Sequence, residues 1–276
     1  MADFSPGDVV IDYSYARPSL TEAKLQGAKA VIRYSAGAAS DPAHPSHAAN
    51  AGKLISADEF KAILAAGLDV IANDEWYETR VTEGYAAGVQ DGRAATALWK
   101  AAGLAQGATV YCSWDAKPSV LKRWKVRRYL KGWRVGSGYY LPDLYAGTPA
   151  LRALLKSASI RFGWRPNAGS WSNDGLPYQP YTGTAAARTS LVVEALPKTP
   201  AHIWQTGNYW FKKQADENLI LRVPVGSHLE TTASPVTTHP NVDQAESDLS
   251  KVAALYKGGR LGRAVRAARA ALKGIR

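Results

Sequence analysis

The chain has 276 residues, of which 46% are apolar and 21% are charged, a balance that allows a large buried core and excludes bulk disorder. A single cysteine, Cys112, excludes a disulfide framework and a cysteine-based zinc site. No run of 18 apolar residues occurs, so no transmembrane segment is expected, and the net charge of +11 comes mainly from eight bases among the last 28 residues.

The first half of the chain repeats a strand–helix unit. Apolar β-type runs predict strands at 9–11, 30–34, 68–72 and 108–114. Capping boxes at 19–22 and 56–59 open two of the helices between them. A long Ala- and Gly-rich helix is expected over 82–104, where Gly88 and Gly92 indicate close packing against a neighbour. Strands alternating with helices at this spacing predict βαβ units and a parallel sheet.

The second half is less regular but continues the alternation. It predicts strands at 141–145, 160–164, 201–205 and 218–221, and helices at 120–131 and 148–157. Residues 166–180 are rich in Gly, Pro, Asn and Ser and predict a long loop. Eight strands with intervening helices predict an α/β fold, a (β/α)8 TIM-type barrel with room for irregularity in its second half. The absence of a GxGxxG motif and of a P-loop disfavours a nucleotide-binding open sheet.

The end of the chain is expected to lie outside the barrel. Composition predicts a barrel domain over 1–225, a linker over 226–248 and a basic amphipathic helix over 249–276. The helix could bind an anionic surface, either lipid or wall polymer, or its apolar face could dock on the barrel or on a partner protein, which we favour. Nucleic acid is not expected as a partner, because no interleaved aromatic residues or base-reading motif accompany the bases.

Candidate site residues follow from the barrel, because active sites of such barrels lie at the C-terminal ends of the strands. Polar and aromatic residues near those ends, or flanking the start of the eighth strand, are Asp12, Arg33, Tyr34, Asp74, Glu75, Trp76, Trp114, Asp115, Trp164, Gln205, Asp216 and Asn218. Carboxylates mixed with Trp and Tyr are typical of a glycosidase, in which one carboxyl holds a proton, another stays ionised and aromatic faces stack on sugars. Each carboxylate taken singly is equally well explained as a helix cap or an ion-pair partner.

Other reactive residue types point to no further chemistry. His44 and His47 form an H-x-x-H pair, but no third ligand is in view, so neither a metal site nor a cofactor is predicted. Cys112 lies inside a predicted strand and is interpreted as a small buried side chain. The sequence has no G-x-S-x-G elbow, which disfavours an α/β-hydrolase.

Several stretches of the sequence resemble a known family. They are VIDYS at 10–14, ARPS at 16–19, GAKAVIRY at 27–34, KLIS at 53–56, GYAAGVQDGRAA at 84–95 and VYCSWD at 110–115, with weaker echoes in IWQ at 203–205 and DENL at 216–219. Over residues 8 to about 222 the chain resembles the glycoside-hydrolase-like domain of actinobacterial cell-wall proteins and actinobacteriophage lysins. That family resembles the family-25 lysozymes in fold, and the resemblance implies an action on peptidoglycan or related glycans.

The resemblance also implies roles for individual residues. The acidic site residues would be Asp12, Glu75 and Asp115, with Arg33 and Asp216 in support. The family usually places a second acid two residues after the fourth-strand aspartate, where this sequence has Lys117. A cation at that position would remove one acid–base partner and alter the pKa of Asp115.

Two hypotheses follow. The first is a phage-encoded glycosidase that acts on cell-wall glycan, with Glu75 as general acid and Asp115 or Asp12 as base or nucleophile. Tyr34, Trp76, Trp114, Trp164, Gln205 and Asn218 would then contact the glycan. The second is a non-catalytic virion protein, a minor tail or tail-tip component, that uses the barrel for glycan binding or as a scaffold, and whose basic helix 249–276 could contact other virion proteins. The N-terminus has no signal-peptide pattern, so the virion, or the host cytoplasm before lysis, is the expected location.

Overall fold

A computed structural model describes residues 4–176, 184–209 and 215–223 of the chain. These residues fall within the first of two compact units, Met1–Ser234. The predicted linker and basic helix lie outside the described residues, so their boundaries stay predictions. In the described part of the chain, no helix combines the length and the apolar character needed to cross a bilayer.

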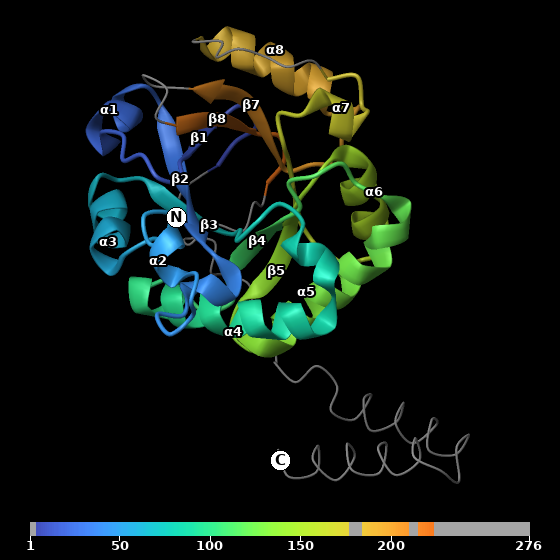
Figure 1. The fold of residues 1–276 in the computed structure, drawn as a ribbon. Helices are drawn as coiled ribbons and strands as arrows, with labels where there is room; N and C mark the ends of the chain where they lie inside the picture. The colour runs from blue at the N-terminus through green and yellow to red at the C-terminus, as the bar shows by residue number, and fades with distance from the viewer. Residues whose placement is uncertain (1–3, 177–183, 210–214, 224–276) are drawn as a thin grey trace, which may run out of the picture. The chain divides into compact units, whose positions relative to one another are not determined.

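Eight strands form a closed barrel in chain order, with helices around it (Figure 1). The strands are β1 (Val9–Asp12), β2 (Ala28–Ser35), β3 (Asp69–Asp74), β4 (Thr109–Ser113), β5 (Leu141–Tyr145), β6 (Gly163–Arg165), β7 (Ile203–Tyr209) and β8 (Ala215–Ile220). The predicted α/β barrel is therefore confirmed, and each predicted strand overlaps an observed one.

Helices and short 3-10 turns connect the strands. The α-helices are α1 (Leu20–Leu25), α2 (His47–Asn50), α3 (Ala57–Ala65), α4 (Tyr85–Ala102), α5 (Arg123–Ser137), α6 (Thr148–Lys156), α7 (Gly169–Ser172) and α8 (Ala185–Ala195). The 3-10 turns are η1 (Gly37–Ser40), η2 (Arg80–Glu83) and η3 (Val120–Lys122). Ser19 and Ser56 cap α1 and α3 as predicted, each accepting a hydrogen bond from a backbone N–H three residues later. The predicted helix at 120–131 is a 3-10 turn followed by α5, and α7 interrupts the predicted loop at 166–180.

The last strand departs from the repeating unit. β8 runs antiparallel to both β7 and β1, whereas all the other neighbouring strands are parallel. Only five residues separate β7 from β8, too few for the crossover that a parallel pair requires. The connection is thus too short for the crossover helix of the repeating unit, and the start of β8 lies beside the end of β1, where Asp216 pairs with Asp12.

Side chains alternate between the barrel interior and the layer under the helices. The interior holds Val10, Ala30, Ile32, Ile71, Tyr111, Tyr145, Trp164, Ile203 and Ile220. The larger apolar cluster lies between the strands and the helices, and it includes the outward-facing Cys112 and Trp114. Every second residue of a strand therefore faces the barrel interior or its mouth, while the residues between them face the helices.

Helices α4 and α5 pack with their backbones in contact (Figure 1). A Cβ added at Gly88 or Gly92 would overlap the carbonyl oxygen of Tyr129 or Trp133 in α5. Glycines of α5 approach α4 in the same way. The close packing predicted for Gly88 and Gly92 is confirmed.

Alanine in place of Gly92 is expected to destabilise the protein, although alanine is the better helix former. Its Cβ would lie 2.9 Å from the Trp133 carbonyl carbon and closer still to the oxygen. We expect the free energy of unfolding to fall by at least about 2 kcal/mol, whereas the same exchange in an exposed helix gains about 1 kcal/mol. Urea unfolding measures this, with Ala97→Gly on the exposed face of α4 calibrating the intrinsic helix preference. Equal or higher stability of Gly92→Ala would contradict the packing.

Candidate active site

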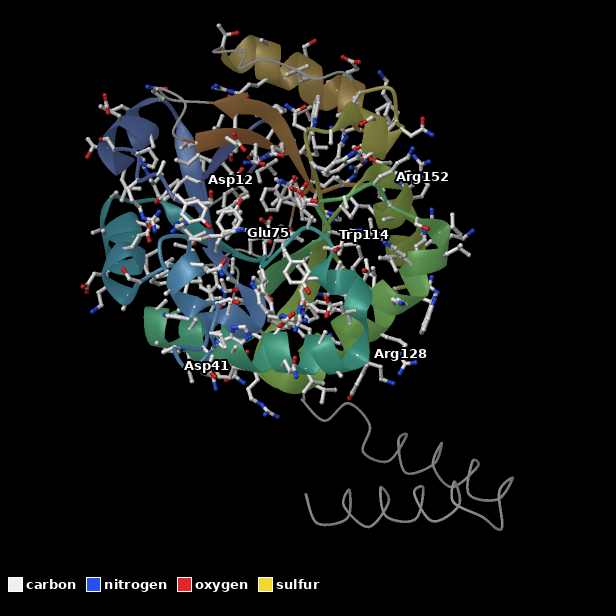
Figure 2. The ribbon with its side chains drawn as sticks, in the orientation of Figure 1. Asp12, Asp41, Glu75, Trp114, Arg128 and Arg152 are labelled. Atoms are coloured by element: carbon white, nitrogen blue, oxygen red, sulfur yellow. The ribbon has the colours of Figure 1, made fainter. Side chains whose placement is uncertain are left out.

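Every strand of the barrel delivers a polar or aromatic side chain to the same end, the end at which the seven parallel strands finish. These residues, listed from β1 to β8, are Asp12, Tyr34, Glu75, Asp115, Tyr145, Trp164, Gln205 and the pair Asp216 and Asn218. We call this group the barrel mouth, and Figure 2 shows Asp12 and Glu75 on the side facing its centre. The eighth strand contributes from its start rather than its end because it is antiparallel.

Asp12 is held by a buried hydrogen-bond network. Its carboxylate oxygens accept from the Tyr34 hydroxyl and from Nδ2 of Asn218, each at 2.7 Å. The Trp164 indole N–H donates to Oδ1 of Asn218 at 2.8 Å, which fixes the orientation of that amide. Burial, reinforced by the neighbouring Asp216 carboxylate, raises the pKa of Asp12 to about 8. Both effects favour the protonated form of Asp12, of which only 4% is exposed.

Gln205 links the β8 side of the mouth to β5. Its Nε2 donates to Asp216 at 2.9 Å, while its Oε1 accepts from the Tyr145 hydroxyl at 3.1 Å and from the backbone N–H of Asn167 at 3.0 Å. All three contacts agree on one orientation of the amide. Gln205 thus positions Asp216, and its predicted contact with glycan stays a prediction.

Glu75 is paired with a lysine that the sequence analysis did not identify as a site residue. Lys53 Nζ donates to Glu75 Oε1 at 2.5 Å and lies 4.9 Å from the centre of the Tyr34 ring. Lys53 comes from the connection between β2 and α3, where Leu54 forms a β-bridge with Tyr34. The only sequence feature that could have identified Lys53 was the KLIS stretch within the family resemblance. No local pattern predicts that this lysine folds back over β2.

Asp115 follows β4 and is half-buried, with its backbone N–H bonded to the carbonyl of Glu78 at 3.0 Å. Burial and then the negative charges of Glu75 and Glu78 raise the pKa of Asp115 to about 6, while a hydrogen bond with Tyr145 and then the Lys53 charge oppose this shift. Lys117 is exposed in the loop that follows Asp115. The mouth therefore holds carboxyl groups with different proton affinities.

Three predicted site residues lie away from the mouth because they face the opposite side of their strands. Arg33 is buried under α3, where it forms a bidentate pair with Glu59 at 2.8 and 3.2 Å. Trp114 is 1% exposed and packs in the layer between the barrel and the helices. Asp74 likewise points outward and accepts from the indole of Trp133 at 2.9 Å. Strand alternation separates them from Tyr34, Asp115 and Glu75, their immediate neighbours in sequence.

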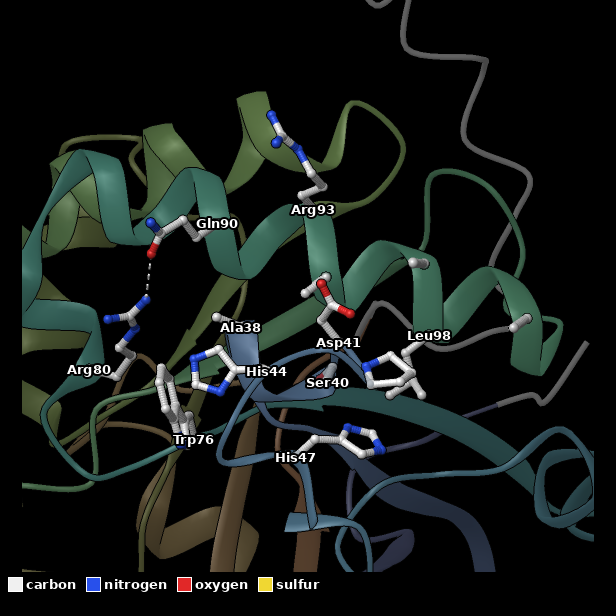
Figure 3. Close-up of a pocket in the computed structure, with 14 residues that line it drawn as sticks. Ala38, Ser40, Asp41, His44, His47, Trp76, Arg80, Gln90, Arg93 and Leu98 are labelled. Atoms are coloured by element: carbon white, nitrogen blue, oxygen red, sulfur yellow. Dashed lines mark hydrogen bonds between the residues drawn. The ribbon is translucent and has the colours of Figure 1, made fainter. Parts of the chain in front are cut away.

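The two remaining tryptophans differ in exposure. Trp164 is inside the barrel but only 1% exposed, so it supports Asn218 and presents no ring face to a ligand. Trp76 is half-buried and lines a groove of about 740 Å³ beside α4, with its ring 4.8 Å from that of His44 (Figure 3). The Arg80 guanidinium lies 4.9 Å from the Trp76 ring. Among the predicted aromatic contacts, Tyr34 is buried as well, which leaves Trp76 as the most accessible ring.

The H-x-x-H pair is held by backbone contacts. Nδ1 of His47 lies 2.9 Å from the carbonyl oxygen of Ala39, and Nδ1 of His44 accepts from the N–H of Ser46 at 3.1 Å. Within residues 4–176, 184–209 and 215–223, no three His, Cys, Asp or Glu side chains gather in a way that could hold a metal ion.

The stability of the protein is expected to fall as pH rises from about 6.5 to about 8.5. Over this range folded Asp12, with its pKa of about 8, still binds a proton that the unfolded chain has lost. Because the folded state binds more protons, its stability decreases by about 2 kcal/mol across the window. Burial lowers the pKa of His202 to about 4, which acts in the opposite sense but mainly below its ordinary value of 6.5.

Urea unfolding at the two ends of this pH range measures the slope. In Asp12→Asn most of the slope should be lost, whatever the absolute stability of the variant, because acids with a pKa of about 6, such as Asp115, contribute only near the lower end of the range. The same slope in the variant and the wild type would show that another group is responsible.

Comparison with known proteins agrees with this architecture. Residues 22–250 match the family model described as "Rv2525c-like, glycoside hydrolase-like domain". The crystal structure of the Mycobacterium tuberculosis Tat-secreted protein Rv2525c in complex with HEPES is 22% identical, with a TM-score of 0.61 over 80% of this chain and 99% of that one. A second crystal form of that protein, with L-tartrate, gives the same identity and TM-score over 80% and 98% of the two chains.

A muramidase from Trichobolus zukalii is 14% identical over 78% of this chain and 94% of that chain, with a TM-score of 0.44. A search of curated protein sequences gave no match.

Proposed function

We propose, from the premise that the chain belongs to the Rv2525c-like glycoside hydrolase-like family, that its barrel mouth binds a bacterial cell-wall glycan and cleaves it by acid–base catalysis. The observation that carries the proposal is the gathering of Asp12, Glu75, Asp115 and Asp216 at one end of the barrel with unequal proton affinities. Glycoside hydrolysis needs such a division between a carboxyl that holds a proton and one that stays charged.

The structure favours a division of roles that differs from the sequence hypothesis. Glu75 forms an ion pair with the Lys53 ammonium, which suits a carboxylate that stabilises positive charge on the sugar or activates water. Asp115 is half-buried with a pKa raised to about 6, which suits the proton donor to the leaving oxygen. Asp12 is too deeply buried to touch a sugar, and in this proposal it orients Tyr34 and Asn218 beneath the substrate.

The test is the release of reducing ends from purified actinobacterial cell walls by the full-length chain. Wild type and the control Asp58→Asn, an exposed acid in the first turn of α3, are expected to release glycan fragments equally. Glu75→Gln is expected to release none while still sedimenting with the walls. Equal release by Glu75→Gln would show that the mouth is not the catalytic site.

A second candidate function, glycan binding without hydrolysis, is favoured by two observations. The short Lys53–Glu75 ion pair occupies a carboxylate of the mouth, and Lys117 replaces the acid that the family usually carries. Wild-type protein that sediments with cell walls but releases no reducing ends would support this candidate. The phage origin and the virion or host-cytoplasmic location stay predictions that accompany either function.

A further inference from the structure

The segment from Asp115 to Asp143 is the most basic part of the described chain. It contains no acidic residue between those two and eight bases: Lys117, Lys122, Arg123, Lys125, Arg127, Arg128, Lys131 and Arg134. Within the described residues, none of the eight takes part in a salt bridge. This positive charge is therefore not paired with acids of the part of the chain that the structure describes.

The outer face of α5 carries an ordered stripe of basic and apolar side chains. Trp124, Arg128, Lys131 and Val135 follow one another at spacings of four, three and four residues, which places them on one face of the helix. Trp124 is 53% exposed, and the Arg128 guanidinium lies 5.6 Å from its ring centre. Figure 2 shows Arg128 pointing away from the barrel.

The turn before α5 extends the stripe with aliphatic side chains. In η3, Val120 is 68% exposed and Leu121 is 83% exposed, and Leu121 lies three residues before Trp124. A single exposed leucine needs no explanation, but three large apolar side chains grouped among unpaired bases mark an interaction surface. We call η3 and the outer face of α5 the basic surface.

The barrel presents this surface rigidly. The opposite face of α5 is buried through Val126, Tyr129, Leu130 and Trp133, and the backbone contact with α4 fixes the helix. Trp124 and Val135, on the outer face of α5, therefore cannot turn inward to escape water. They are available to a partner without any rearrangement of the fold.

We propose that the basic surface docks on an anionic phospholipid bilayer. The charge matches anionic headgroups, and Val120, Leu121 and Trp124 are the residue types that insert at the boundary between headgroups and acyl chains. Apolar insertion and electrostatic attraction to anionic lipids add to one another in the binding of such surfaces to membranes. A nucleic acid or a hydrated wall polymer would match the bases but offers no apolar phase for Val120 and Leu121, so the bilayer accounts for more of the surface. This proposal is independent of the function proposed for the barrel mouth.

Sedimentation of the full-length chain with vesicles tests the proposal. Vesicles of equal parts phosphatidylcholine and phosphatidylglycerol should bind the wild type, and phosphatidylcholine alone should bind it weakly. Arg128→Glu with Lys131→Glu should lower the partition coefficient at least about tenfold. Lys29→Glu with Lys61→Glu, an equal change of charge at exposed positions elsewhere, should lower it much less.

A second pair of substitutions separates a bilayer from other anionic partners. Leu121→Ser with Trp124→Ser should weaken vesicle binding several-fold. The binding that remains should be more sensitive to salt, because it depends on electrostatic attraction alone. Arg128, Lys131, Leu121 and Trp124 are all exposed, so the thermal unfolding temperatures of both double variants should match that of the wild type. A match excludes misfolding as the cause of weaker binding.

Three results would overturn the proposal. If Arg128→Glu with Lys131→Glu left vesicle binding unchanged, the binding would be assigned to the basic residues of 249–276. Binding that is insensitive to Leu121→Ser and Trp124→Ser but abolished by duplex DNA or an anionic wall polymer would assign the surface to that polymer. Failure of the wild type to bind anionic vesicles would reject the bilayer directly.

Discussion

Asparagine in place of Asp115 is expected to lower the rate of glycan cleavage by about 10²- to 10⁴-fold, the usual contribution of a general acid. The amide is nearly the same size but cannot give a proton to the leaving oxygen. Asp115 is half-buried at the barrel mouth, so the substitution should change the catalytic rate more than the stability. Initial rates of reducing-end release from cell walls, compared with Asp58→Asn, measure the effect.

The pH dependence of the rate gives an independent check of this role. Because Asp115 must be protonated to act, wild-type activity should decline as pH rises above its pKa of about 6. Lys53 holds that pKa down, so Lys53→Gln should move the alkaline limb of the profile to higher pH. An Asp115→Asn variant with the wild-type rate, or a limb that Lys53→Gln does not move, would remove Asp115 from the mechanism.

Asp91→Ala is expected to lower the free energy of unfolding by about 3–5 kcal/mol, because it leaves a buried arginine without its main partner. The fully buried Asp91 carboxylate accepts from Nε and Nη2 of Arg80 at 2.7 and 2.9 Å. It also accepts from the Tyr129 hydroxyl at 2.7 Å and the Ala38 N–H at 2.8 Å. These contacts join η1, η2, α4 and α5 behind the loop that carries Glu75.

Glu83→Ala is the matched control for this prediction. Glu83 pairs with the same arginine at 2.6 Å, but its side chain is 44% exposed, so its loss should cost less than about 1 kcal/mol. Urea unfolding of both variants measures the difference. Similar losses for Asp91→Ala and Glu83→Ala would contradict the view that burial makes Asp91 the dominant partner.

Much of the barrel was predictable because its signals are local. Each strand is a short apolar run, and the capping serines Ser19 and Ser56 satisfy backbone N–H groups within one turn of the chain. Gly88 and Gly92 revealed a close helix contact, since side-chain-free positions four residues apart on one helix face have few other uses. The family resemblance rests on such local stretches and is confirmed by the match to residues 22–250.

The candidate site was only partly predictable. Selecting polar and aromatic residues beside the strand ends, and beside the start of the eighth strand, identified Asp12, Glu75, Asp115 and Asp216. The same rule also included Arg33 and Trp114, which alternation turns toward the helices. Period two along a strand would have separated the two sets, because neighbouring residues cannot both face the barrel interior. Lys53 had no such signal.

By itself, the sequence determined the order of strands and helices, the helix caps and the glycine contact, because neighbouring residues encode these features. The tertiary structure alone decided the direction of β8, which brings Asp216 beside Asp12 from 204 residues away. It also decided the Lys53–Glu75 pair and the raised pKa values of Asp12 and Asp115. Those properties depend on burial and on charges from distant segments, and both exist only once the barrel has closed.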